Sequence, residues 1–141
     1  MFECHNLKRI DCEKKAFAFD PEICTLFRKG KIRNTCESGY TSMIDVTETL
    51  FLQRTTKGYF IKESILWTGQ CSYIFTLVEA NDPEIPKEAY GTQTQVEMFP
   101  LDKKSYKSIE YHNGKFTATC KMELIDEQPS QTLYNPELIL Y

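Results

Sequence analysis

Long apolar runs are absent from this 141-residue chain, and so is an excess of charge of either sign. The uninterrupted apolar stretches are only a few residues long, far below the roughly 20 that a helix needs to cross a bilayer. Seventeen basic residues against twenty acidic ones give a formal charge of −3, which is too balanced for an electrostatic grip on nucleic acid or anionic lipid. We therefore expect no membrane span and no nucleic-acid partner.

Signatures of common catalytic and metal sites are also missing. No Gly-x-Ser-x-Gly elbow or phosphate-binding glycine loop occurs, and no two cysteines have C-x-x-C spacing. Of the two histidines, His5 lies beside Cys4 and His112 lies in a predicted turn. A metal site would need Cys4, His5 and Cys12 with a distant fourth ligand, so disulfide cysteines beside an exposed histidine are the simpler interpretation. We expect no enzyme activity, no metal and no cofactor.

Cysteine usage favours an oxidising compartment. The cysteines are even in number and dispersed, as in a disulfide framework, and their spacing leaves fifteen complete pairings open. Met1 does not begin a signal pattern of charged and then apolar residues. We expect a secreted, periplasmic or cell-envelope protein whose leader has been removed. The cysteines are Cys4, Cys12, Cys24, Cys36, Cys71 and Cys120.

The chain divides into three parts. Residues 1–23 are charged with scattered aromatics and reach Pro21, which disfavours helix just before it; they predict a disulfide-tied arm with at most one short helical turn. Residues 24–125 carry β-type patterns and form the predicted domain. Residues 126–141 contain two prolines but finish in an apolar run, so this tail is expected to pack on the domain.

Alternation of apolar and polar residues identifies the strands, because successive side chains of a strand point to opposite faces. It is clearest in 115–125, where Phe116, Ala118, Cys120, Met122 and Leu124 share one face. Hairpin turns are indicated at 57–58 (Lys-Gly) and 113–114 (Asn-Gly). The predicted strands are 26–33, 43–47, 50–56, 59–66, 71–79, 92–99, 105–111 and 115–125, with a turn-rich segment at 34–39 and a proline-containing loop at 81–87.

About eight strands joined mostly by short turns form an antiparallel meander. A single open layer would leave an apolar face and two edges in water, and closure into an up-and-down barrel removes both problems. We predict an all-β fold with one small barrel. The interior of such a barrel is filled by side chains or holds one small ligand.

A loose W-x-x-x-C-x-Y pattern runs through 65–67 (Ile-Leu-Trp) and 70–73 (Gln-Cys-Ser-Tyr), preceded by 24–30 (CTLFRKG) and followed by Thr76-Leu77 and by Gly91. With these residues, 24–125 resembles a family of small secreted bacterial proteins described as lipocalin-like or calycin-like, mostly without assigned function. The lipocalin G-x-W near the first strand is absent. The resemblance implies a lipocalin-like barrel with a Cys24–Cys71 bridge, and it sets Cys4, Cys12 and Cys36 apart as additions particular to this chain.

Aromatic and methionine side chains are spread over the strands, and they could line a cavity for a small apolar or flat ligand or simply fill the barrel. Glu63 differs from them: if it shares a face with Ile61 and Ile65, its carboxylate lies inside and needs a partner such as Arg54 or a tyrosine hydroxyl. The candidate ligand-binding residues are Glu63, Trp67, Tyr73, Phe75, Met98, Phe116 and Met122.

Two functions follow from these alternatives. The first is non-enzymatic binding of a small, largely apolar ligand in the open end of the barrel. The second is a protein–protein interaction module with a filled core that uses the arm and the loop 81–90. A cavity of about 300 Å³ or more would favour ligand binding. An interior closed by Trp67, Phe116 and Met122 would favour the interaction module.

Overall fold

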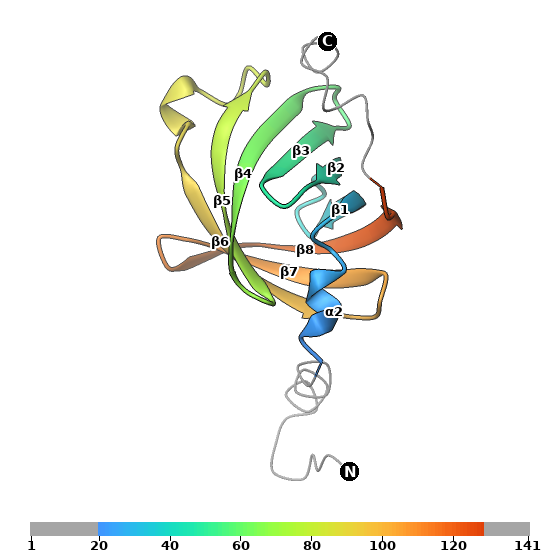
Figure 1. The fold of residues 1–141 in the computed structure, drawn as a ribbon. Helices are drawn as coiled ribbons and strands as arrows, with labels where there is room; N and C mark the ends of the chain where they lie inside the picture. The colour runs from blue at the N-terminus through green and yellow to red at the C-terminus, as the bar shows by residue number, and fades with distance from the viewer. Residues whose placement is uncertain (1–19, 129–141) are drawn as a thin grey trace.

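The computed structural model describes residues 20–128, which form a closed antiparallel barrel (Figure 1). The strands follow one another in sequence order, and β8 pairs with β1, so each strand of the described barrel has a partner on both sides. This confirms the predicted eight-strand meander and its closure. The strands are β1 (Gly30–Cys36), β2 (Thr41–Val46), β3 (Leu50–Thr55), β4 (Phe60–Gly69), β5 (Ser72–Ala80), β6 (Gln93–Pro100), β7 (Ser105–His112) and β8 (Lys115–Asp126).

The start of the barrel differs from the prediction. Residues Glu22–Thr25 form a short helix, α2, and β1 begins at Gly30 rather than at residue 26. Gly30 has a φ of 132°, and a Cβ there would lie 2.5 Å from the backbone oxygen of Asp126, so this entry into the barrel requires glycine. β1 then continues to Cys36 through residues predicted as a turn, because the Asn34 side chain finds a hydrogen-bond partner inside the barrel.

The two ends of the barrel are built differently (Figure 1). One end holds α2, the β4–β5 turn and the β6–β7 turn. The opposite end holds the β1–β2, β3–β4 and β7–β8 turns and the long β5–β6 connection, which contains the 3₁₀ helix η1 (Lys87–Ala89). In the β7–β8 turn, Asn113 and Gly114 have φ values of 52° and 77°, which fits the predicted Asn-Gly hairpin.

Aromatic rings fill the α2 end. Phe27 from the residues after α2 meets Tyr106 edge to face at 4.8 Å, and Tyr73 meets both Phe51 (5.4 Å) and Trp67 (5.0 Å). Burying a large apolar side chain of this kind contributes about 1.5–3 kcal/mol. This half of the interior is therefore a packed core.

Arg28 covers Trp67 at the same end. Its guanidinium carbon lies 4.5 Å from the ring centroid, and its Nη2 donates a hydrogen bond to the Gly69 oxygen at 3.0 Å. The Trp67 Nε1 donates to the Glu48 oxygen at 3.0 Å. The buried Arg28 Nε has no hydrogen-bond partner. Cation–π contact and one hydrogen bond thus hold this cap in place.

Two disulfides hold the described chain. Cys24–Cys71 ties α2 to the β4–β5 turn, which confirms the bridge implied by the resemblance, and Cys36–Cys120 joins β1 to β8 at the closing seam. Cys4 and Cys12 lie outside the described residues, as do most of the predicted arm and tail. The domain boundaries at residues 23 and 125 stay a prediction. Among the described residues, no helix has the length and apolar character needed to cross a membrane.

Candidate ligand cavity in the barrel

A cavity of about 280 Å³ occupies the barrel interior away from α2. Its floor is made by side chains that also belong to the core, including Ile44, Tyr73 and Met122. Its rim includes Ser38 and Tyr40, which are exposed in and beside the β1–β2 turn, so the cavity opens at the end opposite α2. The lining residues are Asn34, Cys36, Ser38, Tyr40, Ile44, Phe51, Gln53, Glu63, Tyr73, Phe75, Ser108, Glu110, Ala118 and Met122.

One wall of the cavity is a continuous chain of polar side chains from β1 to β4. Asn34 Nδ2 donates to Ser42 Oγ at 3.2 Å, and Ser42 Oγ donates to Gln53 Oε1 at 2.9 Å. Tyr40 donates its hydroxyl hydrogen to the same Gln53 oxygen at 3.2 Å, and Gln53 Nε2 donates to Glu63 Oε1. Each strand contributes one inward residue to this wall, because inward positions recur at every second residue.

Glu63 is the most buried carboxyl group of the cavity, with 4% of its surface exposed. The pKa of its carboxyl is raised to about 8. Burial is the main cause, the hydrogen bond from Gln53 opposes the shift, and the nearby Glu110 adds a smaller contribution that raises the pKa. The predicted inward orientation with Ile61 and Ile65 agrees with the burial of all three. Its partner, however, is Gln53 and not Arg54, because Arg54 is the next residue of β3 and therefore points to the opposite face.

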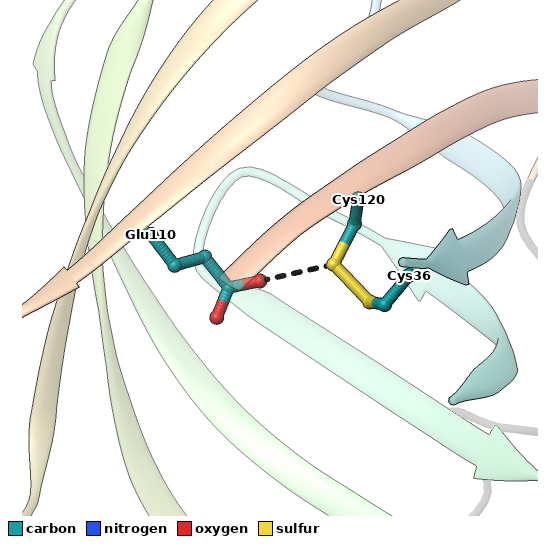
Figure 2. A group of neighbouring side chains, drawn as sticks. All are labelled: Cys36, Glu110 and Cys120. Atoms are coloured by element: carbon teal, nitrogen blue, oxygen red, sulfur yellow. Dashed lines mark hydrogen bonds between the residues drawn. A yellow bond between two sulfur atoms is a disulfide. The ribbon is translucent and has the colours of Figure 1, made fainter. Parts of the chain in front are cut away.

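Glu110 lies on the other side of the cavity, on β7, beside the seam disulfide (Figure 2). One of its carboxyl oxygens lies 3.5 Å from the Cys120 sulfur, and burial raises the pKa of this carboxyl. Cys36, Glu110 and Cys120 together have the ligand-atom spacing of a metal site. Disulfide sulfurs carry no thiolate charge, however, so the oxidised cluster offers a single carboxylate and cannot bind a metal in this way.

The cavity brings together four of the predicted ligand-binding residues, Glu63, Tyr73, Phe75 and Met122. Trp67 and Met98 lie elsewhere: Trp67 caps the α2 end, and Met98 is buried in the packed core, where its backbone N–H donates to the Cys71 oxygen at 2.8 Å. Both belong to the filled half of the barrel because their strand positions are close to the α2 end.

Phe116 was predicted to point inward and is instead 61% exposed. The pairing of β7 with β8 shifts register between Glu110 and Tyr111, so that Ala118 pairs with Glu110 but Phe116 pairs with Tyr111. Directly paired residues share a face, and Tyr111 follows the inward Glu110, so Phe116 lies on the outer face. The bulge reverses the inside–outside order that simple alternation predicts.

Sequence reasoning missed most of the polar lining, chiefly Asn34, Gln53, Ser108 and Glu110. Parity within β3 and β7 contains a signal for some of them. Gln53 lies two residues after Phe51 in β3, and Ser108 and Glu110 lie two and four residues after Tyr106 in β7, so each shares a face with an inward aromatic residue. Polar residues on an otherwise apolar face are the signature of a lined cavity rather than a filled core.

No protein-family model matches the chain, and no curated protein matches it. A solved structure that is similar to it is a de novo designed fluorescence-activating β-barrel. The two have 14% sequence identity and a TM-score of 0.42, and the match covers 73% of this chain and 97% of the designed one. The resemblance to lipocalin-like bacterial proteins stays a prediction.

Proposed function

We propose that this protein binds one small organic molecule in the open half of its barrel, outside the cytosol and without catalysis. The observation that carries the proposal is the cavity itself, which is closed at the α2 end and lined by two kinds of wall. Phe51, Phe75 and Met122 supply apolar surface, and the hydrogen-bonded chain that ends at Glu63 supplies polar groups. Mostly apolar pockets with a few placed polar groups are typical of small-molecule sites.

The volume limits the size of the ligand. The cavity of about 280 Å³ is slightly smaller than the roughly 300 Å³ expected for ligand binding, which is the lower end of the usual range for ligand pockets. The occupant is therefore a small molecule with a flat or compact apolar part. The alternative function, an interaction module, requires a filled core. Only the α2 half of the barrel, where Trp67 and Met98 pack, has a filled core.

Two features support a location outside the cytosol and a function without catalysis. The Cys24–Cys71 and Cys36–Cys120 disulfides are consistent with an oxidising, extracellular environment. The cavity also lacks a histidine or lysine among its lining residues. Of its two serines, Ser38 is exposed in the β1–β2 turn, and Ser108 donates to the Cys120 backbone oxygen at 3.4 Å rather than facing a base. This donor set suits binding better than nucleophilic catalysis.

The test combines native mass spectrometry of protein purified from its source with ligand-observed NMR on a library of small aromatic and aliphatic fragments. A copurified molecule, or fragments that bind the native protein, is the expected result. Ala118→Phe should abolish binding because it places a ring in the cavity. Thr119→Leu is the matched control, since residue 119 is the next position of β8 and points outward. If no fragment binding is lost in Ala118→Phe while its near-UV circular dichroism stays native, the proposal is wrong.

A further inference from the structure

Acidic side chains line the cavity without any basic side chain to balance them. Its lining includes two carboxyl groups, Glu63 and Glu110, and no lysine, arginine or histidine. Within residues 20–128 neither carboxyl takes part in a salt bridge; the pair found there, Lys62–Glu79, lies on β4 and β5 with both side chains partly exposed. A buried carboxylate without a cation is costly, so in the absence of a ligand Glu63 keeps its proton, and it can ionise at neutral pH only if a cation enters the cavity.

The two carboxyls also have spare hydrogen-bonding capacity. Gln53 donates to one Glu63 oxygen, and the second oxygen accepts no hydrogen bond from the described residues. Glu110 has the Cys120 sulfur as its side-chain neighbour, and a disulfide sulfur has no hydrogen to donate. An ionised carboxylate accepts up to about four hydrogen bonds, so both groups are mostly unfilled acceptors.

Their positions favour a ligand between them. Glu63 comes from β4 and Glu110 from β7, with β5 and β6 between these strands, so the carboxyls reach the cavity from separate walls. Phe51 and Phe75 supply apolar and aromatic surface in the same cavity. The arrangement therefore offers acceptors for a donor-rich positive group and rings for an attached apolar body.

We infer that the ligand is a small organic amine, whose ammonium group is held by Glu63 and Glu110 and whose apolar body packs on Phe51 and Phe75. This inference rests on the proposed function and narrows its ligand class. An ammonium group supplies three donors and one positive charge, which matches the vacant acceptors and the missing cation.

Amine binding should be coupled to proton release. Tyr40, Tyr73 and Glu110 are the other titratable groups that line the cavity, and none of them can carry a positive charge to offset an ionised Glu63. Burial holds the Glu63 carboxyl protonated up to a pKa of about 8, so an ammonium ion that binds at neutral pH displaces that proton to solvent. Affinity for the amine should therefore rise between pH 6 and pH 8, whereas affinity for a neutral analogue should stay constant.

The test compares 2-phenylethylamine with its neutral analogue 2-phenylethanol by isothermal titration calorimetry at pH 7 in buffers of different ionisation enthalpy. We expect the amine to bind at least tenfold more tightly, with net proton release, and the alcohol to bind without it. Glu63→Gln keeps an acceptor for Gln53 but cannot ionise, and it should reduce the proton release and remove most of the preference for the amine. Glu110→Gln should weaken amine binding alone. Glu97→Gln, an exposed position on β6, is the matched control and should change neither.

The outcomes separate this inference from the proposed function. If both probes bind equally, or if Glu63→Gln leaves the amine preference intact, the amine inference is overturned while small-molecule binding stands. If neither probe binds and the fragment library also gives no binder that Ala118→Phe excludes, the proposed function fails and the inference fails with it.

Discussion

Gln53 on β3 donates a hydrogen bond from its Nε2 to the buried carboxyl of Glu63 on β4, and this contact joins a polar wall to the most buried carboxyl group of the cavity. The hydrogen bond favours the ionised carboxylate and burial favours the neutral acid. Burial is the larger effect, since the pKa of Glu63 is raised to about 8. The Glu63 carboxyl is therefore mostly protonated at pH 7 in the folded protein and ionises as the pH passes about 8.

The stability of the protein should fall as the pH rises through the range set by Glu63. The unfolded chain releases this proton near the ordinary pKa of 4.5, whereas the folded chain keeps it up to about 8. Between these values the folded state binds more protons, so Glu63 by itself makes the free energy of unfolding decrease with pH, by at most roughly 1.4 kcal/mol per unit. Glu110, whose pKa is also raised by burial, acts in the same direction. Urea denaturation at pH 5, 6, 7, 8 and 9 measures the slope.

Glu63→Gln should flatten this profile, because a glutamine has no proton to lose. Glu97→Gln should leave the slope unchanged, since Glu97 is exposed on β6. Equal slopes for native protein and Glu63→Gln would show that Glu63 ionises freely in the folded state.

Removal of the Cys24–Cys71 disulfide should destabilise the barrel by about 2–4 kcal/mol. The bond links residues 47 apart in sequence and fixes α2 and Phe27 against the α2 end. The double variant Cys24→Ala/Cys71→Ala tests it by chemical denaturation, with reduced and non-reduced intact-mass measurements on the native protein as a check that the bond is formed. Free thiols at both positions in native protein would contradict the expectation.

The hydroxyls of Tyr73 and Tyr106 should be energetically coupled. They lie 3.1 Å apart in the buried core, and each is the hydrogen-bond partner of the other. Tyr73→Phe or Tyr106→Phe alone leaves one hydroxyl without its partner and should cost roughly 1–2 kcal/mol. The double variant should cost clearly less than the sum, which a double-mutant cycle in urea would detect. Additive losses would mean that the hydroxyls find other partners.

Arg28→Lys should loosen the cap over Trp67. Lysine has no planar guanidinium group that could stack on the indole while donating a hydrogen bond to the Gly69 oxygen. We therefore expect a loss of about 1 kcal/mol in the free energy of unfolding and a change in Trp67 fluorescence. Arg33→Lys, an exposed position on β1, is the control. An Arg28→Lys spectrum and unfolding midpoint identical to those of native protein would rule out the proposed role of the stacking.

Phe116→Ser should have little effect on either stability or ligand binding, because the ring is exposed on the outer face. Phe75→Ser is the contrasting variant, since Phe75 lines the cavity, and it should weaken binding of both phenylethyl probes. The same titrations measure both variants. A larger effect from Phe116→Ser than from Phe75→Ser would place the binding surface outside the barrel.

Most of the architecture could be predicted from local patterns. β-type runs and period-two alternation located seven strands and part of the first, and Asn113-Gly114 located the last hairpin, because strand parity and positive φ are properties of a few neighbouring residues. Closure followed from the number of strands and the need to bury one face and both edges. The error at the first strand arose where Gly30 and Asn34 depend on contacts with β8 and β2.

The site was less accessible to such reasoning. The inward orientation of Glu63 followed from parity, but the exposure of Phe116 depends on a bulge in the pairing of β7 with β8. The polar wall depends on which inward residues of neighbouring strands become adjacent once the register is set. Asn34, Ser42, Gln53 and Glu63 are spread over thirty residues of sequence and form one chain of hydrogen bonds only in the barrel.

By itself, then, the amino-acid sequence determined that this chain forms a meander of half-buried strands, since alternation and turn residues act locally. Only the tertiary structure decided that one half of the barrel is packed and the other hollow. That division depends on the volumes of side chains that meet across the interior from distant strands. Large rings such as Phe27, Tyr73 and Tyr106 meet at the α2 end. In the other half, small or polar side chains such as Ser108 and Ala118 occupy inward positions and leave the space that forms the cavity.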